Sequence, residues 1–86
     1  MADLTLDMNG NKTTLKMVSI EKAIDLVDTM ISQAKEKLFI NGINSVSNNK
    51  WTKMKFADGN TYHTKSWSIY YTGKRIEKYS ATIKED

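Results

Sequence analysis

Alternating apolar and polar residues at the start of the chain predict a β-hairpin over residues 3–17, DLTLDMNGNKTTLKM. Its central dipeptide, Asn9-Gly10, is typical of a two-residue type I′ turn, in which both residues need a positive φ. This turn predicts the pairs Leu4 with Leu15 and Leu6 with Thr13 on one face, and Asp7 with Lys12 and Asp3 with Lys16 on the other. A shift of one residue would destroy both patterns, so the turn and the strands predict the same register.

Apolar residues then recur at helical spacing and predict one amphipathic helix over residues 19–40. The stripe consists of Ile20, Ala23, Ile24, Val27, Ile31, Ala34 and Leu38, flanked by Leu26 and Met30. Ser19 is a suitable N-cap, and Asn41-Gly42 supplies a stop. Because no second helix is predicted, we expect this stripe to cover a sheet, with Asp25 and Asp28 on the solvated polar face.

The rest of the chain reads as a loop followed by a sheet. Residues 41–49, rich in Asn and Ser, predict a connecting loop. Residues 50–84 predict a three-stranded meander with turns at 57–60 (ADGN) and 72–74 (TGK). A three-residue loop at 72–74 places Tyr79, Ala81 and Ile83 on the core side. We therefore expect one domain over residues 1–86, of the α+β class: a single antiparallel sheet in the order β-β-α-β-β-β, with the helix packed across one face.

The length of the turn at 57–60 decides which side chains of the meander face the core. A two-residue Asp58-Gly59 loop groups Thr52, Met54 and Phe56 with Trp67, Ile69 and Tyr71, and leaves the basic residues on the opposite face. A three-residue loop would bring Trp51 and Trp67 together and mix lysines into the core. The two-residue register separates apolar from basic residues more cleanly, so it is the preferred prediction.

Charge and aromatic residues are concentrated in the second half of the chain. Residues 1–49 carry five lysines and six acidic residues, whereas residues 50–86 carry seven lysines, one arginine and four acidic residues. Seven of the eight aromatic residues also lie in the second half. This uneven distribution of basic and aromatic residues is typical of a surface that binds a polyanion. Lysines also keep sheet edges soluble, which is the alternative explanation. Arg75 is the one arginine, which argues against reading guanines with arginine forks.

Several classes of chemistry are not expected. The chain has no cysteine, which excludes disulfides, thiolate catalysis and cysteine metal sites. His63 is the sole histidine, and its position within a strand favours a structural role. No phosphate-binding glycine loop, nucleophile elbow or calcium loop is present in the sequence. We therefore predict no enzyme activity, no cofactor and no metal.

The best candidate for a contact surface is a group of aromatic and basic side chains on the meander. Its members are Trp51, Lys53, Lys55, Tyr62, Tyr70, Lys74 and Arg75. Surfaces that bind single strands combine aromatic stacking platforms with basic groups along the backbone. The group therefore predicts a binding module that contacts nucleic acid without sequence specificity. Aromatic cross-strand pairs also stabilise sheets without any ligand, which is the structural alternative.

The segment SWSIYYTGKRIEKY, residues 66–79, resembles part of a known DNA-binding domain. It is similar to the strand-turn-strand of the three-stranded domain that opens many phage and transposon integrases. In that family a Trp-rich strand runs into a Gly-Lys-Arg turn and a basic strand. The family places its helix after the sheet, whereas the helix predicted for this chain precedes it. The resemblance implies DNA contact by the meander.

Two other functions remain open from the sequence. One is a phage-type accessory protein that binds and inhibits a host protein such as a defence nuclease. The other is a homo-oligomeric structural protein that associates through exposed sheet edges. The N-terminus has no signal-peptide pattern and no apolar run reaches the roughly 20 residues that cross a bilayer, so we expect no membrane partner and a cytoplasmic location, in a bacterium or a phage-infected host cell.

Overall fold

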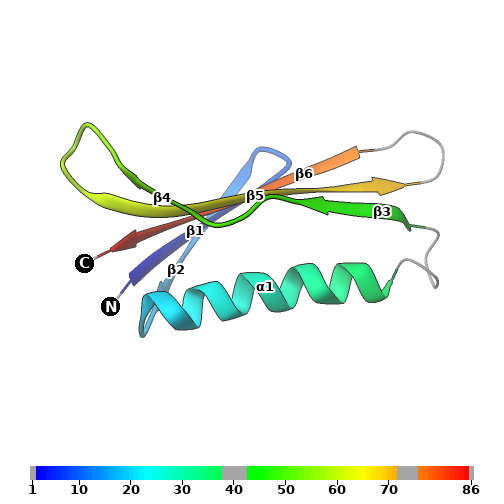
Figure 1. Ribbon diagram of the computed structural model, residues 1–86, viewed down its shortest axis with the longest axis horizontal. Coiled ribbons are helices and arrows are strands. Elements are labelled where there is room, and N and C mark those ends of the chain that lie inside the picture. Colours follow the sequence, from blue (N-terminus) through cyan, green and yellow to red (C-terminus); the bar gives the residue numbers. More distant parts are fainter. Residues whose placement is uncertain (1, 38–42, 72–75, 86) are drawn as a thin grey trace.

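The protein folds as one antiparallel sheet with a helix across one face (Figure 1). The computed structural model describes residues 2–37, 43–71 and 76–85. The elements are β1 (Ala2–Met8), β2 (Asn11–Met17), α1 (Ile20–Glu36), β3 (Ile43–Asn48), β4 (Thr52–Lys55), β5 (Thr61–Tyr71) and β6 (Ile76–Glu85). The strand order is β2-β1-β6-β5-β3, and β4 also pairs with β5. This confirms the predicted fold class.

The β1–β2 hairpin has the register that the sequence predicts. Leu4 pairs with Leu15, and both predicted charge pairs lie opposite each other. Asn9 and Gly10 have φ values of 56° and 92°, as a type I′ turn requires. Asn9 also fastens the turn to β6, because its backbone N–H donates to the Lys78 carbonyl at 2.9 Å and its side-chain oxygen accepts from the Lys78 N–H at 2.8 Å.

Helix α1 begins where the sequence predicts. The Ser19 hydroxyl accepts a hydrogen bond from the Lys22 N–H at 3.2 Å, which confirms the N-cap. Ala23, Val27 and Ile31 are buried against the sheet, so the apolar stripe covers it as expected. The helix ends at Glu36 with Lys37 as its C-cap, four residues before the predicted end at residue 40. Leu38 and the expected stop at Asn41-Gly42 lie outside the described residues.

The segment predicted as a loop contains a strand. Residues 43–48 form β3, which pairs with the second half of β5 from Tyr71 to Trp67. The composition of this segment led to the wrong prediction, because Asn is depleted in strands and both Asn and Ser are common in turns. Strand β5 is 11 residues long and β4 covers only its first part, so the backbone of β3 pairs with the remainder. Val46 packs against the hydrophobic core from this strand.

The preferred register of the β4–β5 hairpin was wrong, and the alternative three-residue loop is the one found. Lys55 pairs with Thr61, the Phe56 N–H donates to the Asn60 carbonyl, and the Gly59 N–H donates to the Phe56 carbonyl. Gly59 alone takes the positive φ, 82°, in this turn. A loop with a type I turn followed by a glycine in the left-handed region is a common three-residue hairpin.

The meander continues into β6 in the predicted register. Tyr70 pairs with Ile76, as a three-residue loop at 72–74 requires, although that loop lies outside the described residues. Ala81 and Ile83 are buried and Tyr79 packs against the same core, as expected. Trp67 and Ile69 are buried as well. Within the described residues, no helix is both long and apolar enough to span a membrane.

Candidate functional site

The sheet has one face covered by α1 and one face that no described element covers (Figure 1). Because side chains alternate along a strand, every second residue of each strand projects from this second face, which we call the open face. Across its middle runs a row of five paired threonines, Thr14, Thr5, Thr82, Thr64 and Thr52, on strands β2, β1, β6, β5 and β4. The open face is therefore a polar platform that crosses the whole sheet.

Aromatic side chains lie on the open face at both ends of β5. Near its start, Tyr62 stacks on Phe56 with ring centroids 4.3 Å apart and an interplanar angle of 26°. Phe56 is 40% exposed, and the neighbouring Met54 is 46% exposed. Near the end of the strand, Tyr70 is 37% exposed. Eight residues separate the two tyrosines, which corresponds to about 26 Å along the strand.

A carboxylate fixes the ring of Tyr62. The Tyr62 hydroxyl donates to Asp58 at 2.7 Å, and the other Asp58 oxygen accepts from the Asn60 N–H at 2.9 Å. The hydrogen bond from Tyr62, supported by that from Asn60, lowers the pKa of Asp58 below its ordinary value of 3.8. The same bond to an ionised carboxylate raises the pKa of Tyr62 above 10.0. Asp58 of the hairpin loop thus fixes the orientation of the Tyr62 ring through its hydroxyl group.

The open face also carries four lysines: Lys12, Lys16, Lys78 and Lys84. Lys84 is directly opposite Tyr62, and Lys78 is directly opposite Ser68. Asp3 and Asp7 share the face, and the Asp58 carboxylate binds Tyr62 there, so the charges of these described residues sum to +1. Among the described residues none of the four ammonium groups makes an ion pair. Unpaired lysines on a hydroxyl-rich surface attract anions and donate hydrogen bonds to them.

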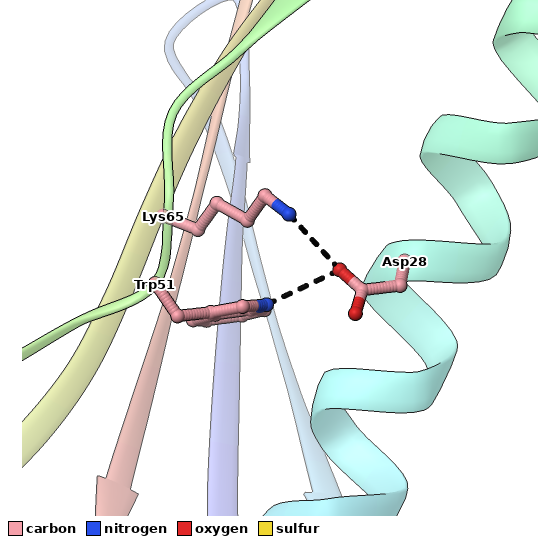
Figure 2. Close-up of polar contacts among 3 residues, drawn as sticks. All are labelled: Asp28, Trp51 and Lys65. Atoms are coloured by element: carbon pink, nitrogen blue, oxygen red, sulfur yellow. Dashed lines mark hydrogen bonds and ion pairs between the residues drawn. The ribbon is translucent and has the colours of Figure 1, made fainter.

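On the covered face, Trp51 and Lys65 converge on one helix carboxylate (Figure 2). The Trp51 indole N–H and the Lys65 ammonium each donate to the same oxygen of Asp28 at 3.1 Å. The Lys65 side chain is 11% exposed, and its nitrogen lies 5.6 Å from the centroid of the Trp51 ring. Asp28 lies on the polar side of the helix as expected, with its side chain 47% exposed, and it is also the partner of a largely buried ammonium group.

The register of β4 with β5 places Trp51 on the covered face, and a one-residue shift between β3 and β4 accommodates it. Asn48 pairs with Trp67, whereas Thr52 pairs with Thr64, so three residues of the edge oppose two residues of β5. Such an extra residue is a β-bulge, which redirects side chains. Trp51 projects toward α1 and packs against the core, where it meets Asp28.

The five predicted contact residues that the structure describes are therefore divided between two faces. Tyr62 and Tyr70 lie on the open face as predicted. Lys53 and Lys55 lie on the opposite face, because Lys53 pairs with His63, which in turn pairs with the buried Ile83. Trp51 is partly buried beneath the helix. Lys74 and Arg75 lie outside the described residues.

Sequence reasoning missed Phe56, Lys78 and Lys84 as members of an aromatic and basic surface. Phe56 was assigned to the core by the wrong register. Lys84 and Lys78 follow from the alternation of β6, since each lies an odd number of residues from the correctly predicted Ala81 and Ile83 and therefore on the opposite face. Applying this alternation to the last strand would have identified both lysines.

His63 lies at the margin of the covered face. Its Nε2 is 3.7 Å from a carboxylate oxygen of Glu85, and this buried nitrogen has no hydrogen-bond partner within the described residues. No group of three or more metal-ligating side chains occurs in the part of the chain that the structure describes. The geometry around His63 agrees with a structural position in the sheet.

No family model, curated protein or solved structure matches this chain. A functional hypothesis therefore has to rest on the surface itself.

Proposed function

We propose that this protein is a binding module that holds single-stranded nucleic acid along its open face. The nucleic-acid strand would lie along β5, between the Phe56–Tyr62 pair at one end and Tyr70 at the other. The proposal keeps the ligand class that the sequence suggests but moves the contact surface. Trp51, Lys53 and Lys55 leave it, and Phe56, Lys78 and Lys84 join it.

The observation that carries the proposal is the placement of exposed rings at the two ends of β5 on the open face. Aromatic side chains on a sheet stack bases, and each stacked base contributes about 1–3 kcal/mol. The hydrogen bond from Tyr62 to Asp58 holds its ring in place before a ligand arrives. A preoriented ring loses little conformational freedom on binding.

Lysines and hydroxyls between the two aromatic ends suit a phosphate backbone. Lys78 and Lys84 lie on the strand next to β5, and the threonine row supplies uncharged donors beside them. Each phosphate that a lysine neutralises releases counterions, which makes affinity fall with salt at a slope of about −0.7 per phosphate for single strands. Lysine donates from a point charge without a fixed fork, which fits backbone contact without base reading.

The test compares two charge reversals of equal size on opposite faces. The variant Lys78→Glu/Lys84→Glu changes the open face, and the matched control Lys53→Glu/Lys55→Glu changes the opposite side of the β4–β5 hairpin. We expect fluorescence anisotropy with single-stranded DNA and RNA oligonucleotides to show loss of binding for the first variant, and at most a minor loss for the control. Equal losses would mean that net charge alone attracts the oligonucleotide. No binding by the parent at low salt would refute the proposal.

Aromatic variants separate stacking from charge. Tyr70→Ala and Phe56→Ala are each expected to weaken binding by about 1–3 kcal/mol while the salt slope stays the same, because stacking releases no counterions. Tyr70→Ala should change the melting temperature little, whereas Phe56→Ala also removes the stacking on Tyr62 and should lower it modestly. A change in salt slope without a change in affinity would contradict the assigned roles.

A second candidate function is favoured by the exposed Met54 and Phe56, which lie next to each other on the open face. Apolar and aromatic side chains of this kind are common anchors of protein interfaces. In that case the protein is an accessory protein that binds and inhibits a host protein through these side chains. Binding would then depend weakly on salt and strongly on Met54 and Phe56, and not on Lys78 or Lys84.

A further inference from the structure

The two edges of the sheet differ in how open they are to another strand. On one side, β3 and β4 are separated by the one-residue shift, β4 has four residues, and the pairing of β3 is irregular between Ile43 and Ser45. On the other side, β2 pairs with β1 over seven consecutive residues without a shift. Bulges and short strands protect sheet edges from further pairing, so β2 is the less protected edge.

Strand β2 leaves both polar and apolar groups without partners. In a two-residue hairpin the pair that flanks the turn is hydrogen-bonded, and hydrogen-bonded pairs then alternate with non-hydrogen-bonded ones. The backbone groups of Asn11, Thr13 and Leu15 therefore bond to β1, while those of Lys12, Thr14 and Lys16 point outward. No described strand pairs with that outward side.

Apolar side chains follow the same edge. Leu15 is 38% exposed, and Val18, directly after the strand, is 80% exposed, the highest value among the large exposed hydrophobic residues of the described chain. Leu15 projects to the covered side of the sheet, because it is opposite the buried Leu4. A partner strand would supply the missing hydrogen bonds and cover Leu15 at the same time.

A second copy of the chain fits this edge better in one of two adjacent registers than in the other. Two antiparallel copies of β2 related by a two-fold axis place one residue opposite itself. If that residue is Thr14, Lys12 of each copy faces Lys16 of the other, which sets like charges opposite each other twice. If it is Leu15, the two leucines face each other, and Lys16 faces Thr14 of the second copy. Charge and apolar contact both favour the second arrangement.

We propose that the protein forms a two-fold dimer by antiparallel pairing of β2 with β2 of a second copy, centred on Leu15. A two-fold axis perpendicular to the sheet keeps both helices on the same side, so the two open faces form one continuous surface. Seven residues of edge make a small interface, and the association is therefore reversible and depends on concentration. The dimer does not depend on the proposed ligand, and its test needs none.

The first experiment measures solution mass and removes one outward N–H. Light scattering or sedimentation of the parent is expected to rise from the chain mass of 9.8 kDa toward twice that value as concentration increases. Proline is tolerated on an edge strand where its position faces solvent. Thr14→Pro should therefore remain folded and monomeric, whereas the control Thr14→Ala, which keeps the N–H, should still associate. A parent that stays monomeric up to about 1 mM, or a folded Thr14→Pro that associates like the parent, would overturn the proposal.

The second experiment tests the register and does not depend on the proline variant folding. The chain has no cysteine, so a single introduced cysteine can cross-link only to its copy. Opposed residues of a non-hydrogen-bonded pair lie about 4.5 Å apart at Cα, within the range that a disulfide bridges. With oxidised glutathione as oxidant, Leu15→Cys should form a covalent dimer many times faster than Thr13→Cys, which lies on the same face two residues away. Equal rates, or faster cross-linking of Thr13→Cys, would exclude the Leu15-centred dimer.

Discussion

The β1–β2 and β4–β5 hairpins begin from similar turn sequences and reach different geometries. Asn9-Gly10 places both residues at positive φ and closes a two-residue turn, whereas in Asp58-Gly59 only Gly59 has a positive φ and the loop holds three residues. The side chain of Asp58 accepts from Asn60 and Tyr62 within its own hairpin, while that of Asn9 reaches β6. A dipeptide ending in glycine therefore indicates a turn, but the bonds of the residue before it help decide the turn's length.

One residue of loop length has a large effect on the second hairpin. It exchanges the two faces of β4, so that Met54 and Phe56 become exposed and Trp51 is directed to the helix. The covered face accepts Lys65 because Asp28 neutralises it at 3.1 Å. A carboxylate 37 residues away in the chain thus permits a register that hydrophobic patterning alone disfavours.

The largest effect is expected from breaking the first hairpin at its turn. Asn9→Val should lower the free energy of unfolding by about 2–4 kcal/mol, because a β-branched residue resists positive φ and the bond to Lys78 is lost. Asn9→Gly keeps the φ and should cost about 1 kcal/mol through the lost side-chain bonds. Urea unfolding measures both. If the two variants were equally stable, the strain at residue 9 would be negligible.

An intermediate effect is expected at the contact that fixes the second hairpin. Asp28→Ala leaves the Lys65 ammonium largely buried without its carboxylate and should cost about 1–3 kcal/mol. Adding Lys65→Met should recover the part of that loss that comes from the ammonium group, since an apolar side chain of similar length needs no partner, while the Trp51 indole N–H still lacks its acceptor. Hydrogen exchange should show faster opening of β4 and unchanged protection of β1 and β2 in Asp28→Ala. Uniform loss of protection would show that Asp28 supports the whole sheet.

The smallest effect concerns the pH dependence of the β4–β5 loop. The lowered pKa of Asp58 means that its bond to Tyr62 stabilises the fold above pH 3.8, and that this contribution is lost as pH falls through the lower folded pKa. The raised pKa of Tyr62 means that the contribution is also lost as pH rises above 10.0, through the higher folded pKa. The melting temperature of the parent should therefore exceed that of Asp58→Asn between these limits.

The same variants should converge at both extremes of pH. Tyr62→Phe provides the matched control, since it removes the hydroxyl and keeps the ring that stacks on Phe56. Its pH profile should follow that of Asp58→Asn. A constant difference between parent and variants at all pH values would show that ionisation of this pair does not affect stability.

The fold was predictable wherever local pattern and turn chemistry determine it. This holds for the register of β1 and β2, the Ser19 cap and the buried stripe of α1. Strand β3 was missed because its pairing with β5 depends on backbone groups, which Asn and Ser residues provide as well as valine does. The candidate surface was half predicted: Tyr62 and Tyr70 were found, but Lys53 and Lys55 were placed on the wrong face because the loop length was not fixed by local sequence.

The pairing of β1 with β6 has a consequence for the order of folding. It joins the two ends of the described chain, with Ala2 opposite Glu85, and the termini lie close together (Figure 1). Contacts so distant in sequence have a high loop-closure entropy and form slowly. A two-stranded hairpin alone is marginally stable in water. The β1–β2 hairpin therefore becomes stable only after β1 has paired with β6. The hairpin that is most clearly encoded by its own sequence is therefore expected to be among the last parts of the sheet to become stable.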